Sequence, residues 1–263
     1  MMDTGAASGS GRSMDLNADV GESFGAWTLG DDDAVLAAVT SANVACGFHA
    51  GDPLTLVRTV TAAAARGVAV GAQVSYPDLV GFGRRELDST PDEIMADVLY
   101  QIGGLDGIAR SVGVRVRYVK PHGALYNRAV RDSAAASALA EAVRRYDPTL
   151  PVLLLAGSAG LRTVADAGLD AVGECFADRA YTSDGRLLPR REPGAVLRDP
   201  ATVIERAVRM AGAGEVVAVD GTVLRLSAGS VCVHGDTPGA GALARQVRTG
   251  LADAGIRVQP FAG

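Results

Sequence analysis

The chain has 263 residues, of which 48% are hydrophobic and 21% charged, and its formal net charge is −5. This composition predicts a large globular α/β protein and excludes a membrane-spanning helix, since no window approaches about 20 uninterrupted apolar residues. The acidic balance argues against nucleic acid as a partner. Cys46, Cys175 and Cys232 lie far apart in apolar runs. With no CxxC pair, they predict buried thiols in a reducing cytoplasm.

The first 13 residues are rich in Gly, Ser and Ala. They lack the apolar segment of a secretory signal, so we expect a disordered extension rather than a targeting sequence. Residues 14–263 contain no low-complexity linker and no internal repeat, and this continuity predicts a single domain.

Short apolar runs alternate with helical patterns through the rest of the chain. Thr90 and Glu93 predict a capping box, while Asp52 and Asp199 each precede a proline that suits the first helical position. The segment Ser133–Tyr146 is Ala-rich and ends in two arginines, as expected for a helix C-terminus. The predicted strands are residues 14–19, 42–46, 68–74, 116–120, 152–156, 171–176, 216–219, 230–233 and 257–260.

Strand–helix alternation repeated about seven times predicts a parallel sheet with helical crossovers. Nearly every strand precedes a polar, Gly-rich cluster, and only in a barrel do all strand ends converge on one site. We therefore expect a TIM-like (β/α) barrel. Residues 216–226 interrupt this rhythm and predict a hairpin with a two-residue turn at Asp220 and Gly221. The polar stretch 177–194 is long for a connection and is a candidate lid.

The clusters after the first two strands contain candidate site residues. Asn17 and Asp19 share strand parity and so point to one face, and Glu22 follows in the turn. Asn43 lies in the second strand, and His49 stands in a Gly-flanked turn ahead of a helix. Such a turn suits an anion or a titratable group. Turn formation alone also explains Asn, Asp and Gly at these positions.

Two further clusters carry cationic groups. Arg84 and Arg85 lie on a Gly-hinged loop that can clamp a carboxylate or phosphate, although a solvated basic turn explains them equally well. Lys120 ends an apolar run and shares a face with His122. It is the only lysine among 25 Lys and Arg residues, which favours a functional role or a buried ion pair.

The last clusters follow the sixth strand and the late strand at 230–233. The first contains Asp178 and Arg179, and the second contains His234, so all three histidines fall at strand ends near glycine. Thr237 and the proline after it predict the start of the last helix. No HExxH, GxSxG or Walker A motif is present, which argues against a zinc protease, an α/β-hydrolase and a P-loop ATPase.

Six long motifs cover essentially the whole chain after residue 13. They are DLNADVGESFG (15–25), SANVACGFHAGDP (41–53), YPDLVGFGRR (76–85), VKPHGALYN (119–127), FADRAYTSDGRL (176–187) and VCVHGDTPGA (231–240). In this order they resemble the signature stretches of the LamB/YcsF lactam-utilisation family, the A subunits of 5-oxoprolinase. The resemblance implies a variant TIM-like barrel of the glycoside hydrolase/deacetylase type.

The resemblance also implies an activity, the opening of the 5-oxoproline lactam to L-glutamate. The reaction would convert ATP, bound with Mg²⁺, to ADP and phosphate, and it would need partner subunits B and C. The motif residues that carry over onto the site are Asp19, Glu22, His49, Lys120, His122, Arg179 and His234.

One position departs from the family pattern. The stretch after the third strand usually reads Gly-Ala-His-Pro, whereas this chain has Gln73 in place of the histidine. Glutamine is neither a strong metal ligand nor a proton acceptor. The departure therefore argues against any metal-dependent mechanism that uses this position.

These observations lead to an expected division of roles. Asp19 or Glu22, with His49 or His122, would activate water as a general base, and Lys120 would neutralise phosphate charge. The residues expected to bind substrate or phosphate are Asn17, Asn43, Arg84, Arg179 and His234. Two alternatives remain open. One is a metal-dependent deacetylase or amidohydrolase whose ion is held by His49, His122 and Asp19, and the other is a non-catalytic lactam-binding subunit.

Overall fold

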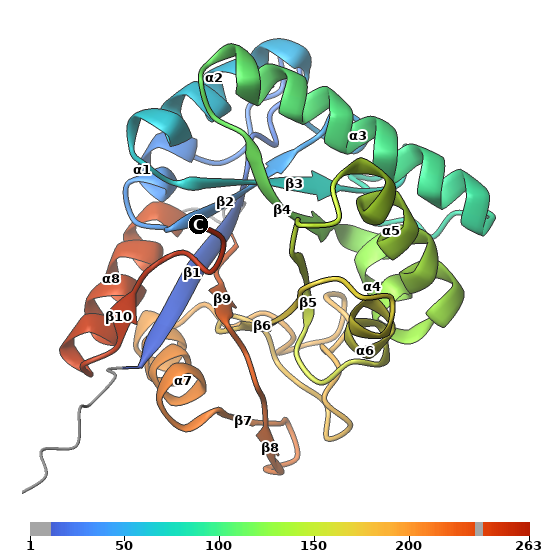
Figure 1. Cartoon of the computed structure of the whole chain (residues 1–263). Coiled ribbons are helices and arrows are strands. Elements are labelled where there is room, and N and C mark those ends of the chain that lie inside the picture. The colour runs from blue at the N-terminus through green and yellow to red at the C-terminus, as the bar shows by residue number, and fades with distance from the viewer. Residues whose placement is uncertain (1–11, 235–238) are drawn as a thin grey trace, which may run out of the picture.

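Seven parallel strands close into a barrel in the computed structural model, which describes residues 12–234 and 239–263 (Figure 1). Six strands follow one another around the wall, and β9 then pairs with both β6 and β1 to close the ring. The closed barrel predicted from the sequence is confirmed. The strands of the wall are β1 (Ser13–Val20), β2 (Ser41–Ala45), β3 (Ala69–Val74), β4 (Val116–Pro121), β5 (Val152–Leu155), β6 (Ala171–Phe176) and β9 (Ser230–Cys232).

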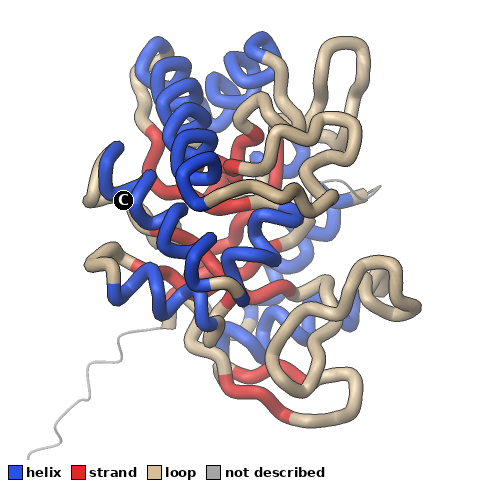
Figure 2. Tube along the Cα trace, turned by 90° about the vertical axis from the view of Figure 1, so that its right-hand side faces the viewer, coloured by secondary structure: helices blue, strands red, loops and turns tan. Residues whose placement is uncertain are grey.

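Helices surround the wall, and the long loops gather on one side of it, opposite the C-terminus (Figure 2). The predicted helix starts are confirmed: Thr90 and Glu93 form the capping box, and the Asp52 and Asp199 carboxylates accept backbone N–H bonds. No helix in the described ranges is long and apolar enough to cross a bilayer. The helices are α1 (Asp32–Leu36), α2 (Pro53–Ala65), α3 (Pro91–Ser111), α4 (Gly123–Arg131), α5 (Ser133–Tyr146), α6 (Ala159–Asp166), α7 (Pro200–Ala213) and α8 (Ala240–Asp253).

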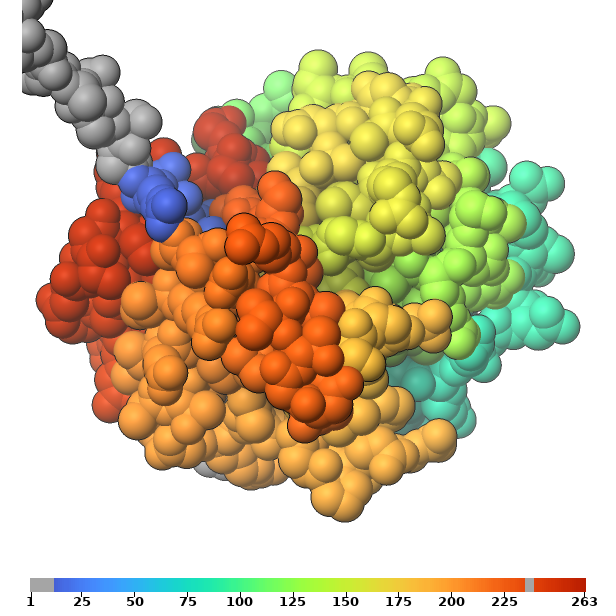
Figure 3. All heavy atoms as spheres, turned by 90° about the horizontal axis from the view of Figure 1, so that it is seen from below, coloured from blue at the N-terminus to red at the C-terminus, as the bar shows by residue number. Residues whose placement is uncertain are grey.

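The hairpin predicted at residues 216–226 is present, but its turn differs from the expected one. Strands β7 (Glu215–Val217) and β8 (Val223–Arg225) pair antiparallel. Ala218 N–H donates to Thr222 O, so the loop has three residues, with Gly221 at φ 88° in the left-handed region. A type I turn followed by a left-handed glycine explains this extra residue. The hairpin lies at the surface of the molecule (Figure 3). It is tied to the long connection after β6, because Val219 N–H donates to Tyr181 O.

The first and last strands of the described chain pair with each other at the start of β1. The short strand β10 (Arg257–Val258) pairs with the start of β1, which begins at Ser13, one residue earlier than predicted. Residues 1–11 lie outside the described residues, and so do Thr237 and Pro238, for which a helix start was predicted. Within residues 177–194, the bridge between Tyr181 and Leu187 orders part of the long connection.

Residue parity divides β1 between two environments. Leu16 and Ala18 belong to the apolar layer between strands and helices, whereas Asn17 and Asp19 belong to the hydrogen-bonded polar cluster inside the barrel. The barrel centre is crossed by Tyr118, which stands opposite Gly71 in the register of β3 and β4. A Cβ at Gly71 would lie 2.2 Å from the Tyr118 ring, so glycine is required there. The barrel interior is therefore largely polar, with a tyrosine beneath its carboxyl-end opening.

Candidate active site at the carboxyl ends of the strands

The floor of the barrel holds a buried carboxyl group surrounded by hydroxyls. Thr40 and Ser41 donate to Asp15 Oδ1 at 2.6 and 2.7 Å, and Ser230 donates to Asp15 Oδ2. Burial raises the pKa of Asp15 to about 6, although the three hydroxyl donors favour its ionised form. Ser230 lies in β9, Ser41 begins β2, and Thr40 directly precedes β2. The floor is thus a closed structural network.

A layer of amides connects this floor to the opening. Asn43 Nδ2 donates to Asn17 Oδ1 (2.7 Å) and Asp19 Oδ1 (2.9 Å), while the Tyr118 hydroxyl donates to Asn43 Oδ1 (2.6 Å). Asn17 Nδ2 donates onward to Ser230 Oγ at 2.6 Å. Both amides are fully buried and engaged within the protein. Their expected contact with substrate stays a prediction, and the structure gives them a second role in positioning Asp19.

Lys120 lies above the amide layer inside a ring of acceptors. Its Nζ is 2.9 Å from Glu174 Oε2, 3.1 Å from Asn17 Oδ1 and 3.5 Å from Asp19 Oδ1. Burial opposes the ammonium form, but the neighbouring anions led by Asp19 outweigh it and raise the pKa of Lys120 well above its usual value. Burial also disfavours the charged form of Asp19, which by itself would raise the pKa of this carboxyl group. The charge of Lys120 outweighs burial, so the pKa of Asp19 lies below its ordinary value. Lys120 therefore keeps Asp19 ionised.

His49 and His122 lie next to each other at the opening. Their rings stack with centroids 4.3 Å apart, and Phe82 packs edge-on against both. Burial lowers the pKa of His49 to about 4 and that of His122 well below its usual value. Both imidazoles are consequently neutral near pH 7 and can accept a proton or bind a metal.

Gln73 links one of these rings to a carboxylate. Its Nε2 donates to Glu22 Oε1 at 3.3 Å, and its Oε1 lies 3.0 Å from His49 Nε2. Because an amide oxygen only accepts, His49 must carry its proton on Nε2 and its lone pair on Nδ1. His49 Nδ1 and His122 Nδ1 are buried, and neither has a hydrogen-bond partner among the described residues. One ligand atom each from Glu22, His49 and His122 lies within 4.8 Å of the others.

The loop after β3 covers the two imidazoles, and a glycine makes this possible. Gly83 has φ 65°, and a Cβ there would lie 2.9 Å from His49 Cβ and 3.2 Å from His122 Nδ1. Arg84 places its guanidinium 4.8 Å from the Phe82 ring centroid. Arg85 instead donates from Nε to Asp78 at 2.9 Å. Of the two arginines considered for a clamp, Arg85 is thus held in an ion pair, and the role of Arg84 in phosphate binding stays a prediction.

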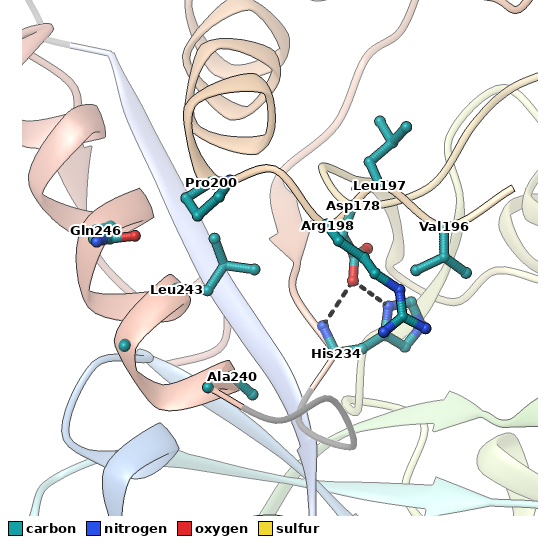
Figure 4. A pocket seen from close by; sticks show the side chains of 11 residues that line it. Asp178, Val196, Leu197, Arg198, Pro200, His234, Ala240, Leu243 and Gln246 are labelled. Carbon is teal, nitrogen blue, oxygen red and sulfur yellow. Dashed lines mark hydrogen bonds and ion pairs between the residues drawn. The ribbon is translucent and has the colours of Figure 1, made fainter. Parts of the chain in front are cut away.

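His234 forms a dyad with a carboxylate from the loop after the neighbouring strand β6. Its Nδ1 lies 2.7 Å from Asp178 Oδ2, and its ring stacks on Phe176 with centroids 5.7 Å apart. A cavity of about 370 Å³ opens beside this dyad (Figure 4). Arg198 also lines this cavity. The cavity lining is Asp178, Val196, Leu197, Arg198, Pro200, His234, Gly239, Ala240, Ala242, Leu243 and Gln246.

Arg179 is bound to the long connection between β6 and α7. Its guanidinium donates to Ala195 O at 3.2 Å and to Leu188 O at 2.6 Å. Burial lowers the pKa of Arg179 to about 10. The arginine therefore stabilises this loop, and its expected contact with substrate or phosphate stays a prediction.

Three site residues were not assigned a role from the sequence. Glu174 and Asp178 follow the polar pattern of the sixth strand, but only the barrel shows that they pair with Lys120 and His234. Gln73 was considered only as the replacement of a histidine. Its position in an interior-facing register of β3, beside Lys120 of β4, was the available signal.

The fold and this buried polar mouth define a closed parallel (β/α) barrel with a polar site at the carboxyl ends of its strands. The chain superimposes on a family 4 carbohydrate esterase from Streptomyces lividans with a TM-score of 0.53 at 10% identity, covering 95% and 93% of the two chains, which shows a shared fold alone. A lactam utilization protein from Thermus thermophilus is far more similar, with a TM-score of 0.90, 46% identity and coverage of 95% and 100%.

Sequence comparison then gives the family. The LamB/YcsF family model matches residues 14–263, and the chain belongs to this family. It is 61% identical to a 5-oxoprolinase A subunit from Mycobacterium avium, with 94% of this chain and 98% of that protein covered. It is 56% identical to the third 5-oxoprolinase A subunit of Pseudomonas syringae pv. tomato, with coverage of 96% and 98%.

Proposed function

We propose that the chain is one subunit of an ATP-dependent 5-oxoprolinase that opens 5-oxoproline to L-glutamate. The observation that carries the proposal is the near full-length similarity, 54–61% identical, to relatives named as 5-oxoprolinase A subunits. The buried acid–base cluster at the barrel mouth supplies groups suited to amide chemistry. Partner subunits B and C complete the enzyme, consistent with the word subunit in those names.

The lactam requires an energy source because its amide is resonance-stabilised and its closed form is favoured over glutamate. Phosphorylation of the carbonyl oxygen by ATP with Mg²⁺ makes the carbon electrophilic. Water adds to that carbon, the C–N bond breaks as the nitrogen takes up a proton, and hydrolysis of the resulting acyl phosphate releases phosphate. No Walker A motif occurs in this sequence, so we assign nucleotide use to the assembled enzyme.

The residues of this chain act on the water and bind the substrate. Asp19 is kept ionised by Lys120 and lies at the barrel mouth, so we assign it the role of general base toward water. His122, which is neutral and 8% exposed, lines the opening where the water is held. His234, oriented by Asp178, faces the adjacent cavity and contacts the substrate.

Activity of the reconstituted enzyme tests this function. Glutamate formation is measured from 5-oxoproline and ATP, with the chain and its partners together and apart. His122→Ala and Lys120→Met should each lower turnover at least about 100-fold, and Arg144→Gln on the outer helix α5 should match the unmodified chain. Near-normal lactam-dependent ATP hydrolysis in both site variants would contradict the proposal.

A second candidate is amide hydrolysis at a bound metal without ATP. One observation favours it, the close approach of ligand atoms from Glu22, His49 and His122. Glutamate formation that proceeds equally well without ATP would favour this candidate over the first. A chain that binds 5-oxoproline but leaves turnover of its partners unchanged would instead be a lactam-binding subunit.

A further inference from the structure

We propose that Glu22, His49 and His122 form a binding site for a divalent transition metal ion such as Zn²⁺, with Gln73 holding the first two in position. The site is a property of this chain by itself. It goes beyond the proposed lactam reaction, because metal binding is measured without partner subunits, ATP or lactam.

The first argument is the convergence of three donor atoms from different loops. Glu22 follows β1, His49 follows β2 and His122 follows β4, yet one ligand atom of each lies within 4.8 Å of the other two. Their side chains are buried, with relative exposures of 7%, 0% and 8%. Two imidazole nitrogens and one carboxylate oxygen are a ligand set that zinc uses when a fourth position stays open.

The second argument is that each of the two imidazoles has a ring nitrogen without any other partner. His49 Nδ1 and His122 Nδ1 are buried without a hydrogen bond to any described residue. A buried polar atom without a partner costs about 1–3 kcal/mol. A metal ion bound by both lone pairs removes this cost.

The third argument is the support provided by Gln73. Its amide donates to Glu22 Oε1 and accepts from His49 Nε2–H, which fixes the lone pair of His49 on Nδ1. Histidine ligands of metals commonly donate their other ring N–H to such a partner. The glutamine that replaces the usual family histidine at this position therefore acts as a positioning residue.

Metal binding requires a small contraction of the cluster. A tetrahedral ion with bonds of about 2.1 Å places its ligand atoms roughly 3.4 Å apart. Because the atoms lie up to 4.8 Å apart, they must approach by at most about 1.4 Å. The stacked rings, 21° from parallel, must also rotate so that both lone pairs point at one ion. The Phe82 ring packs edge-on against both imidazoles and moves with them.

Calorimetric titration of the chelator-treated chain with Zn²⁺ near pH 7 tests the proposal. We expect one ion per chain, and a loss of affinity of at least about 100-fold in His49→Ala, His122→Ala and Glu22→Gln. Gln73→Leu should weaken binding by about 10–100-fold, as loss of a residue that orients a ligand does. His234→Ala removes the third histidine, which is paired with Asp178, and should bind as the unmodified chain does.

Two further measurements keep the result decisive if a variant unfolds. Co²⁺ added to the unmodified chain should give the visible absorption of an ion with nitrogen ligands, and excess Zn²⁺ should remove it. Mg²⁺ should not compete, because it prefers all-oxygen ligand sets. The proposal is overturned if the unmodified chain binds no Zn²⁺, or if Gln73→Leu and all three ligand variants bind it with unchanged affinity.

Discussion

The floor and the mouth of the barrel are both buried and polar, but they differ in how their polar atoms are satisfied. On the floor, Asp15 receives three hydroxyl donors, and Asn17 uses both ends of its amide within the protein. At the mouth, His49 and His122 each leave a buried nitrogen without a hydrogen bond to any described residue.

This difference indicates that the floor of the barrel has a structural role and the mouth a functional one. Buried polar groups are normally hydrogen-bonded, since a buried group without a partner lowers the stability of the folded state. A saturated network such as the floor fixes the geometry of the barrel. The unpaired nitrogens at the mouth are instead available to a ligand or to a reaction. Lys120 belongs to both regions, since it joins Asn17 to Asp19.

The largest expected effect on stability comes from removing the Lys120 ammonium group, which lies between the floor and the mouth. Lys120→Met leaves Asp19 and Glu174 buried without a counter-charge, so the free energy of unfolding should fall by about 3–5 kcal/mol. Guanidinium denaturation followed by circular dichroism measures it. Adding Glu174→Gln to Lys120→Met should recover part of the loss, and a double variant no more stable than the single one would contradict a role in charge pairing.

Asp15 tests whether the floor is structural through the dependence of stability on pH. Its folded-state pKa of about 6 lies above the usual value of 3.8. The protonated carboxyl therefore stabilises the fold fully below about pH 4, and this contribution, up to about 3 kcal/mol, is lost as pH rises through 6. Because Asp15→Asn cannot ionise, it should lose less stability than the unmodified chain as pH rises from about 4 to 6, as measured by urea denaturation.

The exposed carboxylate of Asp166 on α6 provides the control for this comparison. Asp166→Asn should retain the pH slope of the unmodified chain. An Asp15→Asn variant whose stability falls as steeply with pH as the unmodified protein would show that the floor carboxyl is not the group that loses its proton.

Replacing His122 should affect activity much more than stability, in contrast to the changes at Lys120 and Asp15. His122→Ala removes a ring with an unpaired nitrogen, so its unfolding free energy should change by less than about 1.5 kcal/mol, whereas turnover should fall at least about 100-fold. Denaturation and the reconstituted glutamate assay measure the two quantities on one preparation. A fall in stability that matches the fall in turnover would place His122 with the floor rather than the mouth.

The smallest effect is expected at the edge of the mouth. Asp178→Asn keeps the shape of the carboxylate but removes the charge that orients His234. Turnover should fall by about 10-fold, with a raised KM for 5-oxoproline. Steady-state kinetics at several lactam concentrations measures it. An unchanged KM would exclude contact between His234 and the substrate.

Much of this architecture follows from local sequence. The capping box at Thr90 and the Asp-Pro pairs predicted helix starts, and these are confirmed because capping involves only residues three or four apart. Strand parity placed Asn17 and Asp19 on one face for the same reason. The local sequence pattern also predicted that each histidine lies at the end of a strand.

Which strands close the barrel and which side chains pair inside it were decided by tertiary structure alone. Because β6 pairs directly with β9, the hairpin of β7 and β8 that lies between them in the sequence is left out of the barrel wall. Only this closure brings Glu174 to Lys120 and Asp178 to His234. The barrel likewise places Gln73 between Glu22 and His49. Local sequence determines which face a side chain occupies, but contacts between strands far apart in the chain depend on how the whole sheet curves and closes.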